Sequence, residues 1–169
     1  EYGVRGDALS AADRDAFFRM AYEIFRKRPY IVGASVWTYN DYRSRWPVGT
    51  DRKGQRQWGV VTYDRQPKSS YAVLVAESSP AVIRDARATS HGGGSARISA
   101  VVAARADFPA YTLRGYTARI RVFDTAGAVL ATDTADIPTL KPGAAHSIQS
   151  NLPVSGAVAK VHVEVLRPT

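Results

Sequence analysis

The chain has 169 residues, of which 45% are hydrophobic and 22% charged, a composition typical of globular proteins. It contains no cysteine, which excludes disulfide bonds, thiolate metal sites and a cysteine nucleophile. No apolar run approaches the ~18 residues that a membrane-spanning helix needs, so no membrane partner is expected.

The chain carries 23 Lys and Arg against 15 Asp and Glu, a formal net charge of +8. Such a balance is one that nucleic-acid-binding proteins show. The charge is evenly spread, however: residues 1–78 hold 13 basic and 9 acidic side chains, and residues 79–169 hold 10 and 6. With no basic tail and no long basic block, we interpret the charge as a solvated surface and expect no nucleic-acid partner.

The aromatic residues are much less evenly placed. Thirteen of the 17 lie in residues 1–78, among them all three tryptophans. The sequence Ser78-Ser79-Pro80 then opens a stretch rich in Ala, Val and Thr. Ser and Pro often mark the ends of structural elements, so we place a domain boundary here, giving domains 1–78 and 79–169. The glycine run His91–Ser95 is expected to be a flexible loop inside the second domain.

The first domain begins with the signals of a helix followed by a buried strand. Ser10, with Asp13 three residues later, resembles a capping box at a helix start, and Pro29 ends the helical pattern. Residues 30–37 form an almost continuous apolar run. Such a run predicts a strand buried on both faces, as in a parallel sheet covered by helices.

A long polar loop with many aromatics is expected over residues 38–58, followed by a short apolar segment, 59–62. A second helix is predicted from Pro67 to Glu77, with proline at its first position. This order of elements, a helix, a buried strand, a long loop and a second helix, is typical of an α/β barrel, in which the loop follows the carboxyl end of the strand.

The second domain alternates with a period of two. Residues 97–102 form one candidate strand, and Tyr116 to Val122 place apolar side chains on one face of another. Residues 124–127 turn the chain into 128–132, and valines alternate again from 161 to 165. Short strands separated by Gly, Pro and Asp turns predict an antiparallel β-sandwich.

Several kinds of chemistry find no support in the sequence. The three histidines, His91, His146 and His162, are not spaced as metal ligands, so no metal is expected. No serine lies in a nucleophile-elbow sequence. The glycines 92–94 are not followed by the Lys-Ser/Thr of a phosphate-binding loop, and no cofactor is expected.

The loop that begins at Trp37 interleaves large rings with hydrogen-bonding side chains as far as Trp46. Sugars stack their C–H faces on aromatic rings and need directed donors and acceptors for their hydroxyls, and small-ligand sites combine these features. The alternative is that Trp37 and Tyr39 fill the core at the rim of a barrel. The composition does not decide between these two interpretations.

Four segments together resemble the carboxyl-terminal end of the barrel of glycoside hydrolase family 2, which includes β-galactosidases, β-glucuronidases and β-mannosidases. They lie in the family order within residues 1–77, and they are Glu1-Tyr2-Gly3, the run from Arg28 to Ser44, Trp58-Gly59-Val60-Val61, and Arg65-Gln66-Pro67-Lys68-Ser69-Ser70-Tyr71. The resemblance implies the terminal portion of a (β/α)₈ barrel. The second domain would then be an appended immunoglobulin-like β-sandwich.

By position, the resemblance makes Glu1 the catalytic nucleophile of a retaining exo-β-glycosidase and Trp37 the floor of the sugar site. It places substrate contacts in the following loop, at Tyr39, Asn40, Asp41 and Arg43. A retaining glycosidase needs a second carboxylate as acid and base. That group would belong to the remainder of the barrel, because about 77 residues cannot close one. The partners implied are a β-glycoside and the rest of the barrel chain, and this chain alone is expected to be an inactive fragment.

Glucuronidases of this family carry an Asn-x-Lys pair where this chain has Arg56-Gln57-Trp58. Although Arg56 could bind a carboxylate, the departure favours a neutral sugar such as galactose. The family suggests a periplasmic or secreted location. As an alternative function, the sandwich would be a non-catalytic module that binds carbohydrate, with residues 108–111 as its aromatic platform, or that docks on the barrel.

Overall fold

The computed structural model describes residues 1–5, 9–46, 48–91 and 94–168 of the chain, without the side chain of His91. The chain divides into two compact units, Glu1–Ser79 and Pro80–Thr169. The division lies one residue from the boundary expected at Ser78. Most of the regular structure is β-sheet, and the described residues contain two helices.

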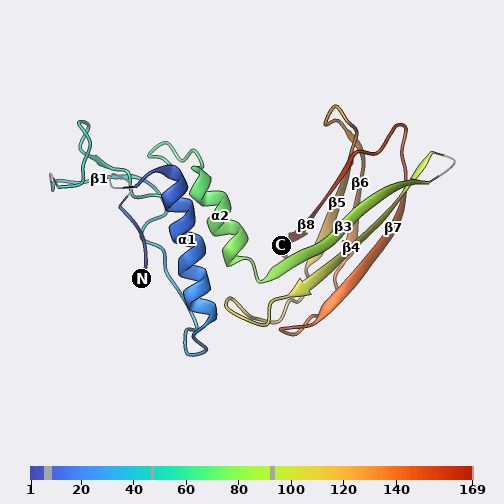
Figure 1. The fold of residues 1–169 in the computed structure, drawn as a ribbon, viewed down its shortest axis with the longest axis horizontal. Helices are drawn as coiled ribbons and strands as arrows, with labels where there is room; N and C mark the ends of the chain where they lie inside the picture. Colours follow the sequence, from blue (N-terminus) through green and yellow to red (C-terminus); the bar gives the residue numbers. More distant parts are fainter. Residues whose placement is uncertain (6–8, 47, 92–93, 169) are drawn as a thin grey trace. The chain divides into compact units, whose positions relative to one another are not determined.

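Unit 1 consists of two helices and a small hairpin (Figure 1). The helices are α1 (Ala11–Arg26) and α2 (Ser69–Ser78), and the two antiparallel strands are β1 (Tyr42–Arg43) and β2 (Gln55–Arg56). The hairpin lies within the segment predicted to be a loop. Figure 1 shows α1 and α2 running in the same direction, so both helices begin at the same end of the unit.

The start of α1 is as predicted, with Ser10 as N-cap. Its hydroxyl oxygen accepts a hydrogen bond from the backbone N–H of Asp13 and donates its proton to the Asp13 carboxylate, 2.6 Å away. Asp13 therefore supports the capping hydroxyl, whereas the Glu of a usual capping box reaches back to the cap's own N–H. The second helix begins later than predicted, because Pro67 forms an isolated bridge with Val61 and lies one residue before the N-cap Lys68.

The prediction of a strand buried on both faces at residues 30–37 is wrong. The segment is extended, but only Val36 pairs, in an isolated parallel bridge with Tyr2. Val32 is 96% exposed and Tyr30 75% exposed. The buried apolar cluster in the described part of unit 1 is small, with Phe18 of α1 and Val73 of α2 packed on Val60 and Val61, and it leaves Tyr30 and Val32 exposed.

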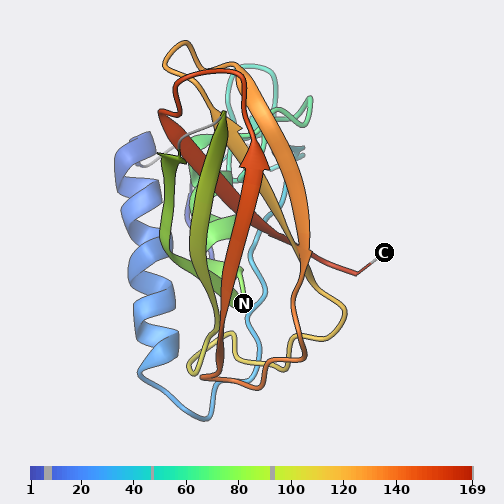
Figure 2. The same cartoon turned by 90° about the vertical axis from the view of Figure 1, so that its right-hand side faces the viewer.

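Unit 2 is an antiparallel β-sandwich of two three-stranded sheets, as the period-two pattern predicts. One sheet has the order β3-β4-β7 and the other the order β6-β5-β8; Figure 2 shows β3, β4 and β7 side by side. The strands are β3 (Ala81–His91), β4 (Ser95–Ala104), β5 (Thr117–Phe123), β6 (Val129–Asp136), β7 (Ala145–Pro153) and β8 (Lys160–Leu166). The glycine run expected to be a flexible loop joins β3 to β4, and its Gly92 and Gly93 lie outside the described residues.

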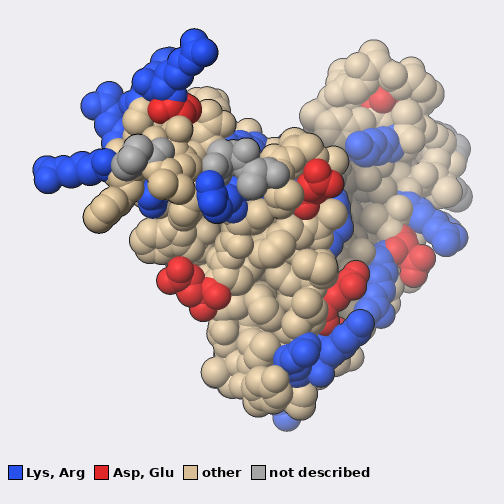
Figure 3. Space-filling model, turned by 60° about the vertical axis from the view of Figure 1, so that its left-hand side comes forward, with Lys and Arg blue, Asp and Glu red and all other residues tan. Residues whose placement is uncertain are grey.

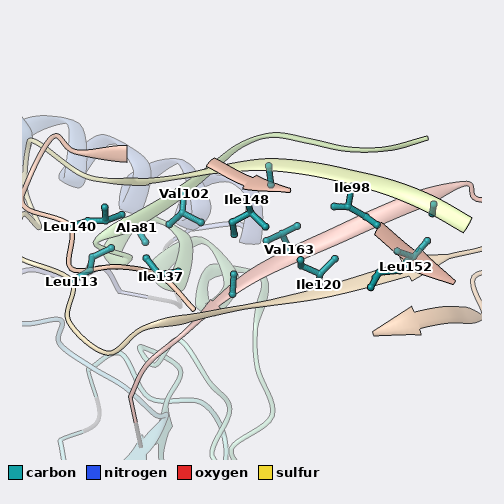
Figure 4. Packing of buried hydrophobic residues seen from close by; sticks show 14 of the residues in the cluster. Ala81, Ile98, Val102, Leu113, Ile120, Ile137, Leu140, Ile148, Leu152 and Val163 are labelled. Atoms are coloured by element: carbon teal, nitrogen blue, oxygen red, sulfur yellow. The ribbon is translucent and has the colours of Figure 1, made fainter. Parts of the chain in front are cut away.

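The core of unit 2 fills the space between its sheets (Figure 4). Ala118, Ile120 and Val122 of β5 are fully buried, as their alternation predicts, and they pack with Ile98 and Val102 of β4. Each side chain in such a core loses its contact with water, which stabilises the fold by about 1.5–3 kcal/mol for a large aliphatic residue. Unit 2 therefore has a continuous core of its own.

Candidate functional site

The first residues of the chain pair with the end of the extended segment. The N–H of Tyr2 donates to the carbonyl of Ser35 at 2.9 Å, and the N–H of Trp37 donates to the carbonyl of Tyr2 at 2.8 Å. This is a parallel pairing, and α1 forms the connection between the two stretches of chain. Because parallel neighbours end at the same edge of a sheet, the pairing brings Glu1 and Trp37 to one place.

The two stretches approach each other closely at Gly3. A Cβ atom added to Gly3 would lie 1.9 Å from the carbonyl oxygen of Trp37. Real side chains never come so near to a backbone atom, so glycine is required for this pairing. Trp37 is followed by a cis peptide bond to Thr38.

Glu1 and Trp37 line a common cavity of about 340 Å³, together with the rest of residues 1–5 and with Trp58. This volume is within the usual range of ~300–1,000 Å³ for small-ligand sites. Trp37 is 49% exposed, and Glu1 is exposed as well. An accessible carboxylate and an accessible indole thus share one hollow, and Glu1 is the acidic residue among those that line it.

Trp58 is a wall of this cavity that the sequence interpretation missed. Tyr42 meets both indoles edge-on, with ring centroids 6.3 Å from Trp37 and 6.3 Å from Trp58. Two guanidinium groups lie over the Trp58 ring, with the Cζ of Arg56 4.7 Å and that of Arg5 5.9 Å from its centre. Cation–π contacts of this kind hold an aromatic ring in place. The sequence feature that could have identified Trp58 as a lining residue is its position at the end of the aromatic loop.

Arg56 is engaged within the loop. Its guanidinium donates to the hydroxyl of Tyr42 and to the carbonyl of Val48, both at 3.3 Å, in addition to covering Trp58. The Nε of Arg56 has no hydrogen-bond partner among the described residues, and this side chain, which the sequence offered as a partner for a sugar carboxylate, does not line the cavity of Glu1 and Trp37. Figure 3 shows Lys and Arg side chains gathered at the end of unit 1 that carries the β1–β2 hairpin.

The four further residues expected to contact substrate do not line the cavity. Tyr39 is half exposed and meets Tyr71 edge-on, and the guanidinium of Arg43 lies over the ring of Tyr63. The side-chain amide of Asn40 donates to the carbonyl of Asp41 at 2.8 Å.

Asp41 is buried, with 5% of its surface exposed, and it holds the loop together. Its Oδ1 accepts hydrogen bonds from the Nζ of Lys68 at 2.6 Å and from the N–H of Gly59 at 2.9 Å. A Cβ on Gly59 would lie 2.3 Å from the Asn40 carbonyl carbon, so Asp41 can reach this amide only because residue 59 is glycine. The structure gives Asp41 a supporting role.

The charged side chains around Asp41 are largely buried. Burial lowers the pKa of the Lys68 ammonium, the carboxylate of Asp41 opposes this effect, and the charge of Arg14 adds to it. The Nη1 of Arg14 donates to the carbonyl of Gly59 at 3.4 Å. These contacts join Arg14, Gly59, Asp41 and Lys68 in one network, next in the chain to Trp58.

The described part of the chain contains no cluster of three or more His, Cys, Asp or Glu side chains that could hold a metal ion. Within the same residues, neither helix is long and apolar enough to cross a membrane.

In unit 2, Tyr111 of the expected aromatic platform is exposed, and its hydroxyl lies 3.2 Å from that of the half-buried Tyr116.

Comparison of the chain with known proteins gives no assignment. No protein-family model matches it, and no curated protein matches its sequence at a significant level.

Proposed function

We propose that unit 1 is part of the sugar-binding and catalytic end of a retaining β-glycosidase barrel of the family 2 type. The observation that carries the proposal is the cavity shared by Glu1 and Trp37. A carboxylate beside an accessible indole suits the first step of double displacement, in which the sugar would stack on the ring while the carboxylate attacks its anomeric carbon. The parallel pairing through α1, with α2 running in the same direction, is the order of a (β/α)₈ barrel.

In this mechanism Glu1 forms a covalent glycosyl-enzyme intermediate. A second carboxylate, ~5–5.5 Å away, first protonates the leaving oxygen and then takes a proton from the water that releases the sugar. Glu1 has no carboxylate partner among the residues that line the cavity. The second carboxylate therefore belongs to the remainder of the barrel, and this chain alone binds sugar without cleaving it. The exposed Tyr30 and Val32 belong to the surface that such a barrel would cover.

The substrate proposed is a neutral β-glycoside, of the β-galactoside kind. Arg56 contacts Tyr42, Val48 and Trp58 and does not line the cavity, whose lining includes the indoles of Trp37 and Trp58. Arg5 also lines the cavity and lies over Trp58. Aromatic walls suit the apolar faces of an uncharged sugar.

The sandwich is proposed to be immunoglobulin-like and to serve as a structural or docking module. The first, second and fifth strands of unit 2 form one sheet, and the third, fourth and sixth form the other. This connectivity is similar to the A-B-E and C′-C-F strands of immunoglobulin-type domains.

The test uses the chain extended upstream with its natural coding sequence and an aryl β-galactoside as substrate. Replacement of Glu1 by Gln is expected to abolish turnover, and a fluorinated galactosyl donor is expected to label Glu1 covalently. Glu23→Gln, an exposed carboxylate on α1, is the matched control and should retain full activity. Full activity of Glu1→Gln would overturn the proposal.

Sugar binding by the chain itself can be followed separately by tryptophan fluorescence. Two of the three tryptophans, Trp37 and Trp58, line the cavity, whereas Trp46 is exposed outside it. Galactose is expected to change the emission of the chain and of Trp46→Phe, and to leave the emission of the Trp37→Phe, Trp58→Phe double variant unchanged. A response that is lost with Trp46 alone would place the sugar elsewhere.

A further inference from the structure

Unit 1 has a second cavity, of about 200 Å³, at the end where its two helices begin. Ala11, the first residue of α1, lines it, as do Ser69 and Ser70, the first two residues of α2. Figure 1 shows that the helices run in the same direction, so the positive ends of two helix dipoles meet at this cavity. Arg14, Lys68 and Gln57 complete its lining.

The start of α2 has no side-chain cap. Its N-cap residue is Lys68, whose side chain accepts no hydrogen bond from the helix, and the helix has no acidic residue in its first turn. The first N–H groups of a helix lack partners within the helix and are usually satisfied by a Ser, Thr, Asp or Asn side chain, by water or by a ligand. In α2 this end faces the cavity, where a bound anion could take the place of the cap.

The hydroxyl of Ser70 is the second, independent sign of a ligand. Ser70 is 1% exposed, and its Oγ has no hydrogen-bond partner among the described residues. Buried hydroxyls without a partner are rare in proteins, because they lose their water without replacement. Ser70 also lines the cavity, so a bound acceptor would satisfy it.

Two cations complete the cavity. Arg14 is 8% exposed and the side chain of Lys68 is 19% exposed, so both charges are largely removed from water. The ammonium of Lys68 donates to Asp41 at 2.6 Å and weakly to the carbonyl of Gln57 at 3.4 Å. One of its three N–H donors is therefore left for a bound ligand. Two carboxylates contact lining residues, Asp41 at Lys68 and Asp15 at Ser69, but neither lines the cavity itself.

We propose that this cavity binds an oxyanion of the phosphate class. Lys68 and Arg14 supply the charge, and the Ser70 hydroxyl and the first N–H groups of α2 supply the directed hydrogen bonds. The volume suits a phosphate group and is smaller than the ~300–1,000 Å³ of pockets that enclose larger molecules. The site is separate from the cavity of Glu1 and Trp37, and it does not depend on the proposed glycosidase function.

The experiment titrates the full chain with inorganic phosphate at constant ionic strength, followed by the NMR shifts of backbone amides. Saturable shifts are expected at Ser69 and Ser70, with chloride alone producing none. A phosphate monoester, such as glycerol phosphate, distinguishes the source of the ligand: tighter binding than phosphate identifies a phosphorylated metabolite, and equal or weaker binding identifies the free ion. Shifts that do not saturate, or that spare Ser69 and Ser70, would overturn the proposal.

Two variants test the individual contacts. Ser70→Ala is expected to weaken phosphate binding about 3- to 10-fold, the effect of one hydrogen bond, whereas Ser78→Ala at the other end of α2 leaves it unchanged. Gln57→Glu adds a carboxylate to the lining from outside both helices and is expected to weaken binding about 10-fold or more, with Gln57→Ala as its control. If Ser70→Ala does not fold, the Gln57 pair decides; equal affinity in Gln57→Glu and Gln57→Ala would contradict the site.

Discussion

The two units of this chain use their apolar residues in opposite ways. In unit 2, large aliphatic side chains from both sheets meet in one core, with Ile98 of β4 and Ile120 and Val122 of β5 fully buried. In unit 1, the buried apolar cluster has Phe18, Val60, Val61 and Val73, and much of the remaining apolar and aromatic surface is exposed. The exposed side chains of unit 1 include Met20, Tyr30, Val32, Trp37, Tyr39, Trp46 and Val48.

The difference follows from how each type of element buries its surface. Two antiparallel sheets cover each other, so a sandwich of six strands completes its own core. A strand of a parallel sheet needs neighbours in the sheet and helices on its faces, and the parallel pairings in the described part of unit 1 are two isolated bridges, Tyr2 with Val36 and Asn40 with Val61. Buried polar residues take a larger part in holding unit 1 together, as the Arg14, Asp41 and Lys68 network shows. Four predictions test this comparison, from the largest effect to the smallest.

Separating the units is the strongest test. Residues 80–169 are expected to unfold cooperatively on their own with a stability of about 5 kcal/mol or more, as is usual for a domain of this size. Residues 1–79 are expected to retain less than about 2 kcal/mol, because their core is small and their apolar surface is exposed. Urea unfolding followed by circular dichroism measures both. Equal stability of the two pieces would refute the comparison.

Truncating one aliphatic side chain in each unit tests the comparison of their cores at single residues. Ile120→Ala in the central strand β5 is expected to cost about 3 kcal/mol, because it leaves a cavity in a fully buried site. Val32→Ala removes a side chain that is 96% exposed and is expected to change stability by less than about 0.5 kcal/mol. Denaturant midpoints of the two variants give the comparison, and a large loss in Val32→Ala would show that Val32 is buried in solution.

Glycine substitutions test the pairing that builds the candidate site. In Gly3→Ala the new methyl group would meet the carbonyl oxygen of Trp37, so the two segments must separate, at a cost of about 2 kcal/mol. Gly33→Ala on the paired segment is the control, since no atom lies within 4 Å of its added Cβ. Tryptophan emission should change in Gly3→Ala and stay unchanged in Gly33→Ala. Unchanged emission in both variants would mean that Glu1 and Trp37 do not meet as described.

The smallest effect concerns an exposed ion pair of unit 2. Glu164 accepts hydrogen bonds from Arg119 and Arg121, and although its partial burial opposes them, these two cations lower its pKa. A carboxyl whose pKa is lowered by folding adds stability above its unfolded pKa, and this stability is lost as the pH falls through its folded pKa. Glu164→Gln should therefore cost about 0.5 kcal/mol near pH 7, a typical value for exposed pairs.

The control for Glu164 is the same measurement in acid. The stabilities of the wild-type chain and Glu164→Gln should converge as the pH falls through the lowered folded-state pKa of Glu164, and they should be equal well below it, where the carboxyl is protonated in both states. A difference that persists there would mean that Gln disturbs the packing of β8 rather than the ion pair.

Part of the fold is readable from short stretches of sequence. The capping by Ser10 involves Asp13, three residues away, and the burial of Ala118, Ile120 and Val122 follows from the alternation of a single strand. Strands β3 and β7 were not predicted. In β3 the register shifts between Arg84 and Arg87, which breaks the alternation, and most side chains of β7 are polar, with Ile148 and Leu152 buried.

Some features of the candidate site could likewise be read from the sequence, and others could not. By itself the sequence determined the helix start and the alternating strands, because these depend on neighbours along the chain, and through a family resemblance it offered Glu1 and Trp37 as candidate site residues. Only the tertiary structure decided that Trp58 completes the cavity, that Asp41 is buried against Lys68, and that most of residues 30–37 are exposed. Each of these features depends on which distant segments of the chain cover a side chain, and the local sequence pattern does not predict such contacts.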